Sequence, residues 1–217
     1  MNDKQICFIA CVNNDDYERE MRYYIERLQV PQGYEIQIQT VKGAASMCAG
    51  YNMAMNASDA TIKVYLHQDV YIVNRYFISD LLELLSADSK IGMVGMIGAP
   101  HMPENMIMWG APRVGCAYTQ TPYSSGAGMA GAVEGTWREV EAVDGFLMAT
   151  RVDIPWCEDI LDGWDFYDVA QCKSMREAGY KIVVPRQDEP WCIHDDGFMN
   201  LKNYYGYRKK YLEWSAE

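Results

Sequence analysis

The first half of the sequence alternates short apolar runs with helix-like segments, and this order restricts the fold more than any other feature. Residues 6–12 form a continuous apolar run, typical of a strand that is buried on both faces. Residues 34–41 alternate between polar and apolar types and predict a second strand, and residues 63–66 predict a third. Strand, helix, strand, helix, strand implies right-handed crossovers and a mostly parallel sheet in an α/β domain.

The segments between these strands have the features of helices. In the first of them, apolar and aromatic residues recur on one helical face: Tyr17, Met21, Tyr24, Ile25 and Leu28. The small residues of 44–57 predict a second helix, packed closely on its neighbours. Residues 77–85 predict an amphipathic helix and residues 91–97 a further apolar strand.

The second half of the sequence is less regular. Four prolines and the run SSGAGMAGA interrupt residues 99–136, which we expect to form a long irregular insertion. Beyond it, residues 139–150 predict a strand interrupted at Asp144, residues 167–178 a helix, and residues 181–184 a short strand. An aromatic-rich helix is expected over 200–214. We expect one domain, 1–217, with the insertion marking a division between residues 1–98 and 99–217.

Charge and cysteine usage exclude several classes of function. The formal net charge of −11 disfavours binding to nucleic acid and to an anionic membrane, because both require a basic surface. The seven cysteines form no CxxC pair, which is typical of buried thiols in a reducing compartment. The N-terminal apolar run is too short for a signal peptide, and no stretch has the ~20 apolar residues of a membrane span. A cytoplasmic location is the expectation.

Polar residues follow two of the predicted strands at the point where each strand ends. One set is Asn13 to Asp16, whose side-chain oxygens can also cap the next helix, and the other is His67, Gln68 and Asp69. In open α/β sheets, ligands bind beyond the carboxyl ends of the strands, so both sets are expected at one edge near a site. A carboxylate there can hold a divalent cation and, through it, a phosphate. The alternative is that Asp69 caps the following turn.

Other polar and aromatic residues could have either a functional role in a site or a purely structural role. Asp165 and Asp168 lie at or near the start of the helix 167–178, where carboxylates also serve to cap a helix and favour its dipole. Trp109 is suited to stacking on a sugar or base, or to covering a neighbouring core. The segment PWCIHDDG ends in a cluster of His194, Asp195 and Asp196. His67, Asp69, His194 and Asp195 would suffice for a metallohydrolase site, although their spacing matches no hydrolase motif.

Five segments, in order, resemble the family 2 glycosyltransferases, which have the GT-A fold. These segments are FIACVNND, GAASMCAGYNMAMNASDATIKVYLHQDV, VDGFLMATR, DGWDFYDVAQCKSMREAGYKIVVP and HDDG. More narrowly, the chain is similar to a bacterial branch of short glycosyltransferase-like proteins. The resemblance implies an α/β three-layer sandwich around a mostly parallel central sheet. The half 1–98 would bind the nucleotide sugar, and the half 99–217 would provide acceptor and catalytic residues.

The resemblance also implies an activity and a metal site. The family's metal-dependent, inverting members move a sugar from a nucleoside-diphosphate sugar to an acceptor hydroxyl, here a glycan, a lipid-linked molecule or a protein. Asp69 matches the last acidic position of the family's DxD signature, which holds Mn²⁺ or Mg²⁺. His194 would be a second ligand. His67 replaces the other carboxylate of the signature and could bind a transition metal, but it is a poor ligand for Mg²⁺. An oligomer is compatible with all of these features.

The remaining site residues are also carried over from the resemblance. Asp168 matches the general base, and Asp165 is the second choice. The other positions that would contact or border substrate are Val12, Asn13, Asn14, Asp15, Ser46, Asn52, Gln68, Asp144 and Trp164, with Asp144 on the acceptor side. The sequence departs from the family after the second strand, where Thr40-Val41-Lys42-Gly43 lacks the Asp that contacts the nucleobase. A non-catalytic nucleotide-sugar-binding or partner module with the same fold is therefore the alternative.

Overall fold

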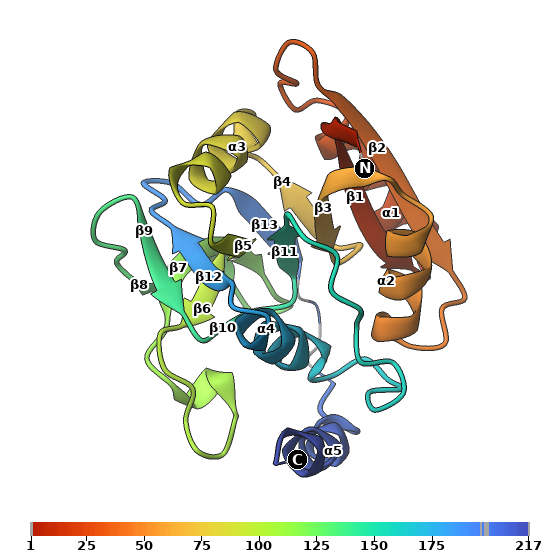
Figure 1. Cartoon of the computed structure of the whole chain (residues 1–217), viewed down its shortest axis with the longest axis vertical. Helices are drawn as coiled ribbons and strands as arrows, with labels where there is room; N and C mark the ends of the chain where they lie inside the picture. Colours follow the sequence, from red (N-terminus) through yellow and green to blue (C-terminus); the bar gives the residue numbers. More distant parts are fainter. Residues whose placement is uncertain (1, 196, 198–199, 217) are drawn as a thin grey trace.

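A seven-stranded sheet runs through the centre of the protein (Figure 1). The computed structural model describes residues 2–195, 197 and 200–216. From one edge to the other the strands are β2 (Glu35–Lys42), β1 (Asn2–Val12), β3 (Ala60–Leu66), β11 (Leu147–Thr150), β5 (Ile91–Gly95), β12 (Lys181–Pro185) and β9 (Trp137–Val140). Only β11 and β9 run against the direction of the other strands. The predicted mostly parallel sheet is confirmed, and in it β1 lies between β2 and β3.

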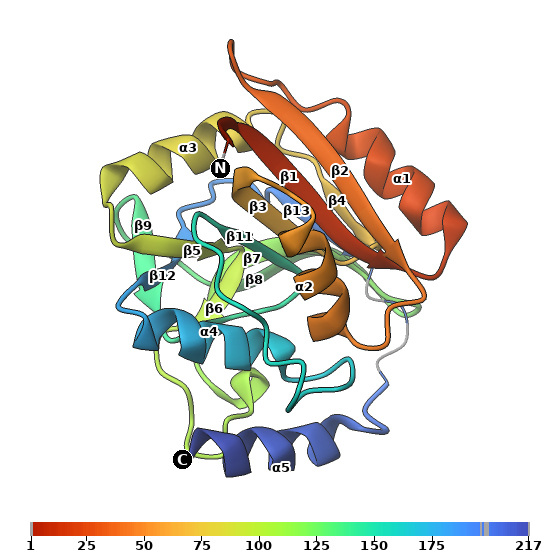
Figure 2. The same cartoon turned by 45° about the vertical axis from the view of Figure 1, so that its right-hand side comes forward.

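Helices cover both faces of this sheet, which confirms the three-layer sandwich (Figure 2). The helices are α1 (Asp15–Ile25), α2 (Met47–Asn56), α3 (Phe77–Ala87), α4 (Tyr167–Glu177) and α5 (Tyr204–Ser215). Successive residues of β1 point to opposite faces, so Phe8 packs in the core beneath α1 and α3, while Ile9 packs in the core beneath α2 and α4. Helix α5 adds Tyr211 to the core on the α2 and α4 side.

A second, smaller sheet lies beside the first and includes the strand that follows Asp69 and the strand that contains His194. Its order is β10 (Ala142–Val143), β6 (Ile97–Ala99), β7 (Val114–Gln120), β13 (Cys192–Asp195) and β4 (Val70–Ile72), with β8 (Ser125–Gly131) paired to β7. Strand β4 begins directly after Asp69, and β13 pairs with β4 in antiparallel register. The far C-terminal part of the chain is thereby brought next to the end of β3.

The segment 99–136 is more regular than the sequence suggests. It contains a 3₁₀ turn, η1 (Met108–Gly110), and the antiparallel hairpin β7–β8, so the prediction that its Gly/Ala/Ser-rich run breaks every regular element is wrong. At two of the glycines, a side chain would collide with the backbone of a neighbouring segment. A Cβ at Gly115 would lie 2.1 Å from the carbonyl oxygen of Met96, and one at Gly131 would lie 2.6 Å from that of Arg113. Close approach of backbones explains a glycine-rich strand.

The predicted strand 139–150 is also corrected by the structure. It is divided into three strands. The chain leaves the central sheet after β9, joins the second sheet at β10, and returns to the central sheet at β11. A buried charge in β3 was not foreseen either. The Lys63 side chain is fully buried, and its Nζ donates to both carboxylate oxygens of Asp153 at 2.9 Å. This pair attaches the loop after β11 to the central sheet.

All seven cysteines are free thiols, and six of them are buried, as expected for cysteines that pack as small apolar residues. None of the helices in the described part of the chain combines the length and apolarity needed to cross a bilayer.

Candidate functional site

The ends of β1 and β3 meet at one edge of the central sheet, as predicted. The Oε1 atom of Gln68 accepts hydrogen bonds from the backbone N–H groups of Asn13 (2.9 Å) and Asn14 (3.0 Å). Its Nε2 atom donates to Asn13 Oδ1 at 2.7 Å. The Gln68 side chain thus holds the two strand ends together, and its neighbours His67 and Asp69 line the same cavity.

His194 reaches this edge through the second sheet. In the β13–β4 pairing His194 lies opposite Val70, and the backbone N–H of Asp195 donates to the carbonyl oxygen of Asp69 at 2.9 Å. The ring of Phe146 stacks on the imidazole of His194, with centroids 5.0 Å apart. Strand register and stacking therefore place the His194 ring beside Asp69.

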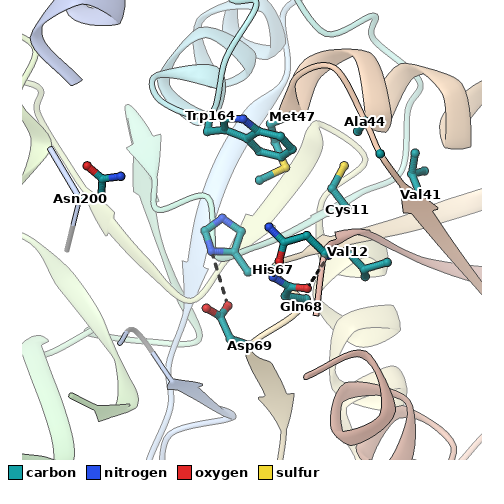
Figure 3. Close-up of a pocket in the computed structure, with 12 residues that line it drawn as sticks. Cys11, Val12, Val41, Ala44, Met47, His67, Gln68, Asp69, Trp164 and Asn200 are labelled. Carbon is teal, nitrogen blue, oxygen red and sulfur yellow. Dashed lines mark hydrogen bonds and ion pairs between the residues drawn. The ribbon is translucent and has the colours of Figure 1, made fainter. Parts of the chain in front are cut away.

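His67, Asp69 and His194 form a cluster with the spacing of a metal site, and Figure 3 shows two of its members, His67 and Asp69. Oδ1 of Asp69 lies 3.9 Å from His67 Nδ1 and 3.8 Å from His194 Nε2, and one donor atom of each residue lies within 4.8 Å of the others. An ion held about 2.1 Å from each donor requires donor atoms roughly 3 to 4 Å apart, so small side-chain rotations suffice. Two imidazoles and one carboxylate favour a transition metal such as Mn²⁺ over Mg²⁺.

Both imidazoles are neutral at pH 7, which is the form that binds a metal. Burial lowers the pKa of His67 to about 4. Burial, with a smaller contribution from the neighbouring His67, lowers the pKa of His194 to about 3. The other ring nitrogen of His67, Nε2, is hydrogen-bonded to the hydroxyl of Tyr167.

A cavity of about 490 Å³ adjoins the cluster, which is within the usual range for a small-molecule site (Figure 3). Six of the predicted site residues line it: Val12, Asn13, His67, Gln68, Asp69 and Trp164. Two other lining residues, Val41 and Gly43, belong to the stretch after the second predicted strand where the sequence departs from the family. The sequence did not single out the remaining four, which are Cys11, Ala44, Met47 and Asn200. The part of the cavity wall that Val41 and Gly43 form is apolar.

The side chains of four other predicted substrate-binding residues bond to other parts of the protein. Asn14 caps α1, accepting hydrogen bonds from the next turn, and Ser46 caps α2 through Ala49 N–H. Asp15 forms an exposed ion pair with Lys42. The buried Asn52 amide donates to and accepts from the backbone of Trp156. None of these four side chains lines the described cavity, and their contact with substrate stays a prediction.

Of the two candidate bases, Asp168 is the second residue of α4 and Asp165 lies two residues before the helix begins. The carboxylate of Asp168 accepts hydrogen bonds from the backbone N–H groups of Gly145 (3.1 Å) and Val169 (2.8 Å). Burial is the main cause that raises the pKa of Asp168, to about 6. Burial also raises the pKa of Asp165. Asp168 faces a separate small cavity whose other lining residues are Met108, Trp109, Phe166, Val169 and Tyr204.

Asp144 is half-buried in the turn before β11, and its Oδ1 accepts a hydrogen bond from Phe146 N–H at 3.3 Å. Asp195, the fourth ligand in the metallohydrolase interpretation, is not a member of the three-residue cluster. Asp196 lies outside the described residues. The sequence did not single out Tyr167, because no local pattern reveals its hydrogen bond with His67, 100 positions away.

Comparisons with known proteins bear on the family and the fold of the chain. A sequence model described as "Glycosyltransferase like family" matches residues 7–214. No curated protein sequence matches the chain.

Solved structures of similar fold include the mannosyltransferase PcManGT from Pyrobaculum calidifontis in complex with GDP-Man and Mn²⁺. It has a TM-score of 0.60 at 12% identity, over 99% of this chain and 64% of its own. TarS from S. aureus has a TM-score of 0.60 at 11% identity, over 96% of this chain and 39% of its own. A TarS structure in complex with UDP-GlcNAc has a TM-score of 0.57 at 10% identity, over 94% and 64%. This likeness confirms the expected GT-A fold, and the chain spans less than two thirds of each of these proteins.

Proposed function

The chain belongs to the glycosyltransferase-like family, and on that premise we propose that it is a metal-dependent inverting glycosyltransferase. Its donor would be a nucleoside-diphosphate sugar and its acceptor a hydroxyl of a glycan, a lipid-linked molecule or a protein. The observation that carries the proposal is the cluster of His67, Asp69 and His194 beside a cavity large enough for a nucleotide sugar. A neutral histidine pair with a carboxylate suits a cation that faces a diphosphate.

The proposed roles of the donor-side residues follow from their positions. His67, Asp69 and His194 would hold Mn²⁺, or less favourably Mg²⁺. The bound cation would supply Lewis acidity that neutralises charge on the departing nucleoside diphosphate. Asn13 and Trp164, which line the cavity, would contact the donor, with Gln68 fixing the edge on which it rests.

Asp168 is the proposed general base. Its pKa of about 6 leaves the carboxylate ionised at pH 7 and basic enough to accept a proton near neutral pH. The acceptor oxygen would attack the anomeric carbon and lose its proton to Asp168 as the bond to the diphosphate oxygen breaks. This single displacement inverts the anomeric centre. Asp165 is the second candidate, and Asp144 would lie on the acceptor side.

The wider assignments are part of the same proposal. The chain would act as one domain, with residues 1–98 binding the donor and residues 99–217 serving the acceptor. Free, mostly buried thiols support a cytoplasmic location.

A non-catalytic nucleotide-sugar-binding module is the second candidate. The observation in its favour is the apolar wall at Val41 and Gly43, where the family's base-contacting carboxylate is missing. Such a module would keep the cavity and the cation site without sugar transfer.

Thermal unfolding with UDP-, GDP- and dTDP-sugars, each with and without Mn²⁺, tests the proposal. A donor at about 100 times its Kd stabilises the protein by ~2.7 kcal/mol, which raises the Tm of a chain of this size by roughly 5 to 10 °C. We expect this shift for one class of donor, larger with Mn²⁺, together with release of nucleoside diphosphate. A shift without sugar release would favour the binding module, and no shift with any donor would contradict both functions.

A further inference from the structure

The hydroxyl of Tyr167 lies 2.5 Å from Nε2 of His67, on the side of the imidazole opposite to Asp69. Tyr167 is the first residue of α4 and is almost completely buried. The two ring nitrogens of His67 therefore face different partners. Nδ1 faces the Asp69 carboxylate and the cluster, while Nε2 faces a single phenol in the protein interior.

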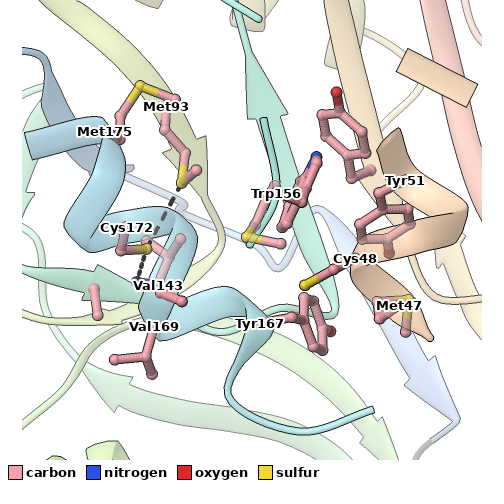
Figure 4. Close-up of a cluster of buried hydrophobic side chains, with 14 of the residues drawn as sticks. Met47, Cys48, Tyr51, Met93, Val143, Trp156, Tyr167, Val169, Cys172 and Met175 are labelled. Carbon is pink, nitrogen blue, oxygen red and sulfur yellow. Dashed lines mark hydrogen bonds between the residues drawn. The ribbon is translucent and has the colours of Figure 1, made fainter. Parts of the chain in front are cut away.

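The Tyr167 side chain is held in place on several sides. Its ring packs in a buried aromatic group with Tyr51 and Trp156, at centroid distances of 6.0 and 6.1 Å (Figure 4). The backbone of Gly145 lies directly against its hydroxyl, and a Cβ at Gly145 would lie 2.2 Å from the phenol oxygen. This packing restricts the movement of the Tyr167 hydroxyl, so the position of the hydrogen bond to the His67 imidazole is fixed.

The turn before Tyr167 adds to this restraint. Phe166 has a left-handed backbone conformation with φ of 63°, which is rare for a bulky residue. Its buried ring packs against Tyr204 and Tyr211 of α5, with centroids 4.9 and 5.7 Å away. Packing of α5 on Phe166 thus compensates the strained turn that presents Tyr167 to His67 and Asp168 to its own cavity.

We infer that Tyr167 is a positioning residue for the cation site, acting through a hydrogen bond that fixes the orientation and proton placement of the His67 ring. The inference rests on the proposed metal-dependent function. A neutral imidazole carries one proton, and a cation can bind only the nitrogen without it. When His67 Nε2–H donates to the Tyr167 oxygen, the lone pair of Nδ1 is directed at Asp69. Loss of such an outer partner typically weakens metal binding 10- to 100-fold.

The test is Mn²⁺ binding to the purified full chain, measured by the electron paramagnetic resonance signal of the free ion. Tyr167→Phe removes only the hydroxyl, and we expect it to weaken Mn²⁺ binding 10- to 100-fold. Tyr51→Phe is the matched control. It removes a buried hydroxyl from the same aromatic group, bonded to the carbonyl oxygen of Leu66 instead of an imidazole, and should leave Mn²⁺ binding within about twofold.

Comparing Tyr167→Phe with and without His67 distinguishes an effect on the His67 ring from a general loss of structure. In a His67→Ala background, adding Tyr167→Phe should change Mn²⁺ affinity no further, because the hydroxyl has no imidazole to orient. Equal Mn²⁺ affinity in wild type and Tyr167→Phe would overturn the inference, as would an equal loss with His67 present or absent. If the wild type itself binds no Mn²⁺, the metal site of the proposed function fails first.

Discussion

Asp168→Asn is expected to lower sugar transfer by about 10²- to 10⁴-fold while leaving the affinity for nucleotide and Mn²⁺ unchanged. The amide cannot accept the proton of an acceptor hydroxyl, and general-base catalysis contributes a factor of this size. The variant should still fold, since burial disfavours the ionised carboxylate and the pKa of Asp168 is raised by it. Steady-state transfer rates and Mn²⁺-dependent nucleotide titrations measure the two effects separately.

The pH profile gives this prediction a second readout. Because the pKa of Asp168 is about 6, the wild-type rate should be constant above pH 7 and fall about tenfold per pH unit below pH 6. The residual rate of Asp168→Asn should lack that dependence. The same raised pKa means that folding stability attributable to Asp168 is present at low pH and is lost as pH rises through 6. Its replacement should therefore not destabilise the protein at pH 8.

Two neighbouring aspartates serve as comparisons for Asp168. Asp162→Asn changes an exposed carboxylate that pairs with Lys210, and it should keep the wild-type rate. Asp165→Asn tests the second candidate base. If Asp165→Asn abolishes transfer and Asp168→Asn does not, the base is Asp165 and the assignment of Asp168 is wrong.

Asp69→Asn is expected to lower the rate of sugar transfer by a similar factor, because it removes a ligand of the proposed cation. Asp69 is the one carboxylate in the cluster, and both imidazole donors lie within 4 Å of its Oδ1. Stabilisation of charge by a bound metal is worth several kcal/mol, and each 1.36 kcal/mol is a factor of ten, so transfer should fall about 10³-fold. Mn²⁺ should no longer strengthen nucleotide binding.

The control for Asp69→Asn is Asp16→Asn, which removes an exposed carboxylate at the start of α1, near the same sheet edge. It carries the same change of charge and should leave both transfer and Mn²⁺ dependence unchanged. Unaltered donor turnover and metal-dependent nucleotide binding in Asp69→Asn would require a different metal site.

The parts of the fold that were predictable are those with local causes. The apolar run of β1, the alternation of β2 and the one-sided apolar face of α1 each reflect a period that the sequence displays directly. The meeting of Asn13 with Gln68 followed from the topology of parallel strands, because their carboxyl ends share one edge. The base role of Asp168 and the ligand role of His194 came from family resemblance, since the local pattern left both residues with more than one interpretation.

The parts that were not predictable depend on contacts between distant segments. The glycine-rich sequence of β7 and β8 resembles a loop, yet these strands pair as a hairpin. At Gly115 and Gly131 a carbonyl oxygen of a distant segment leaves no room for a Cβ, a contact that the local sequence does not reveal. A lysine in a strand is expected to face solvent, and only the distant Asp153, which pairs with it, explains why Lys63 is buried. Likewise, nothing around Tyr167 in the sequence indicates His67 as its partner.

The most direct test of the central claim is a crystal structure of the full chain with a nucleoside diphosphate and Mn²⁺, with the ion located by its anomalous scattering. The account predicts one Mn²⁺ at about 2.2 Å from donor atoms of Asp69, His67 and His194, with the diphosphate bound to it in the cavity beside Asn13 and Trp164. An ion or a nucleotide bound elsewhere, with this cluster unchanged, would contradict it.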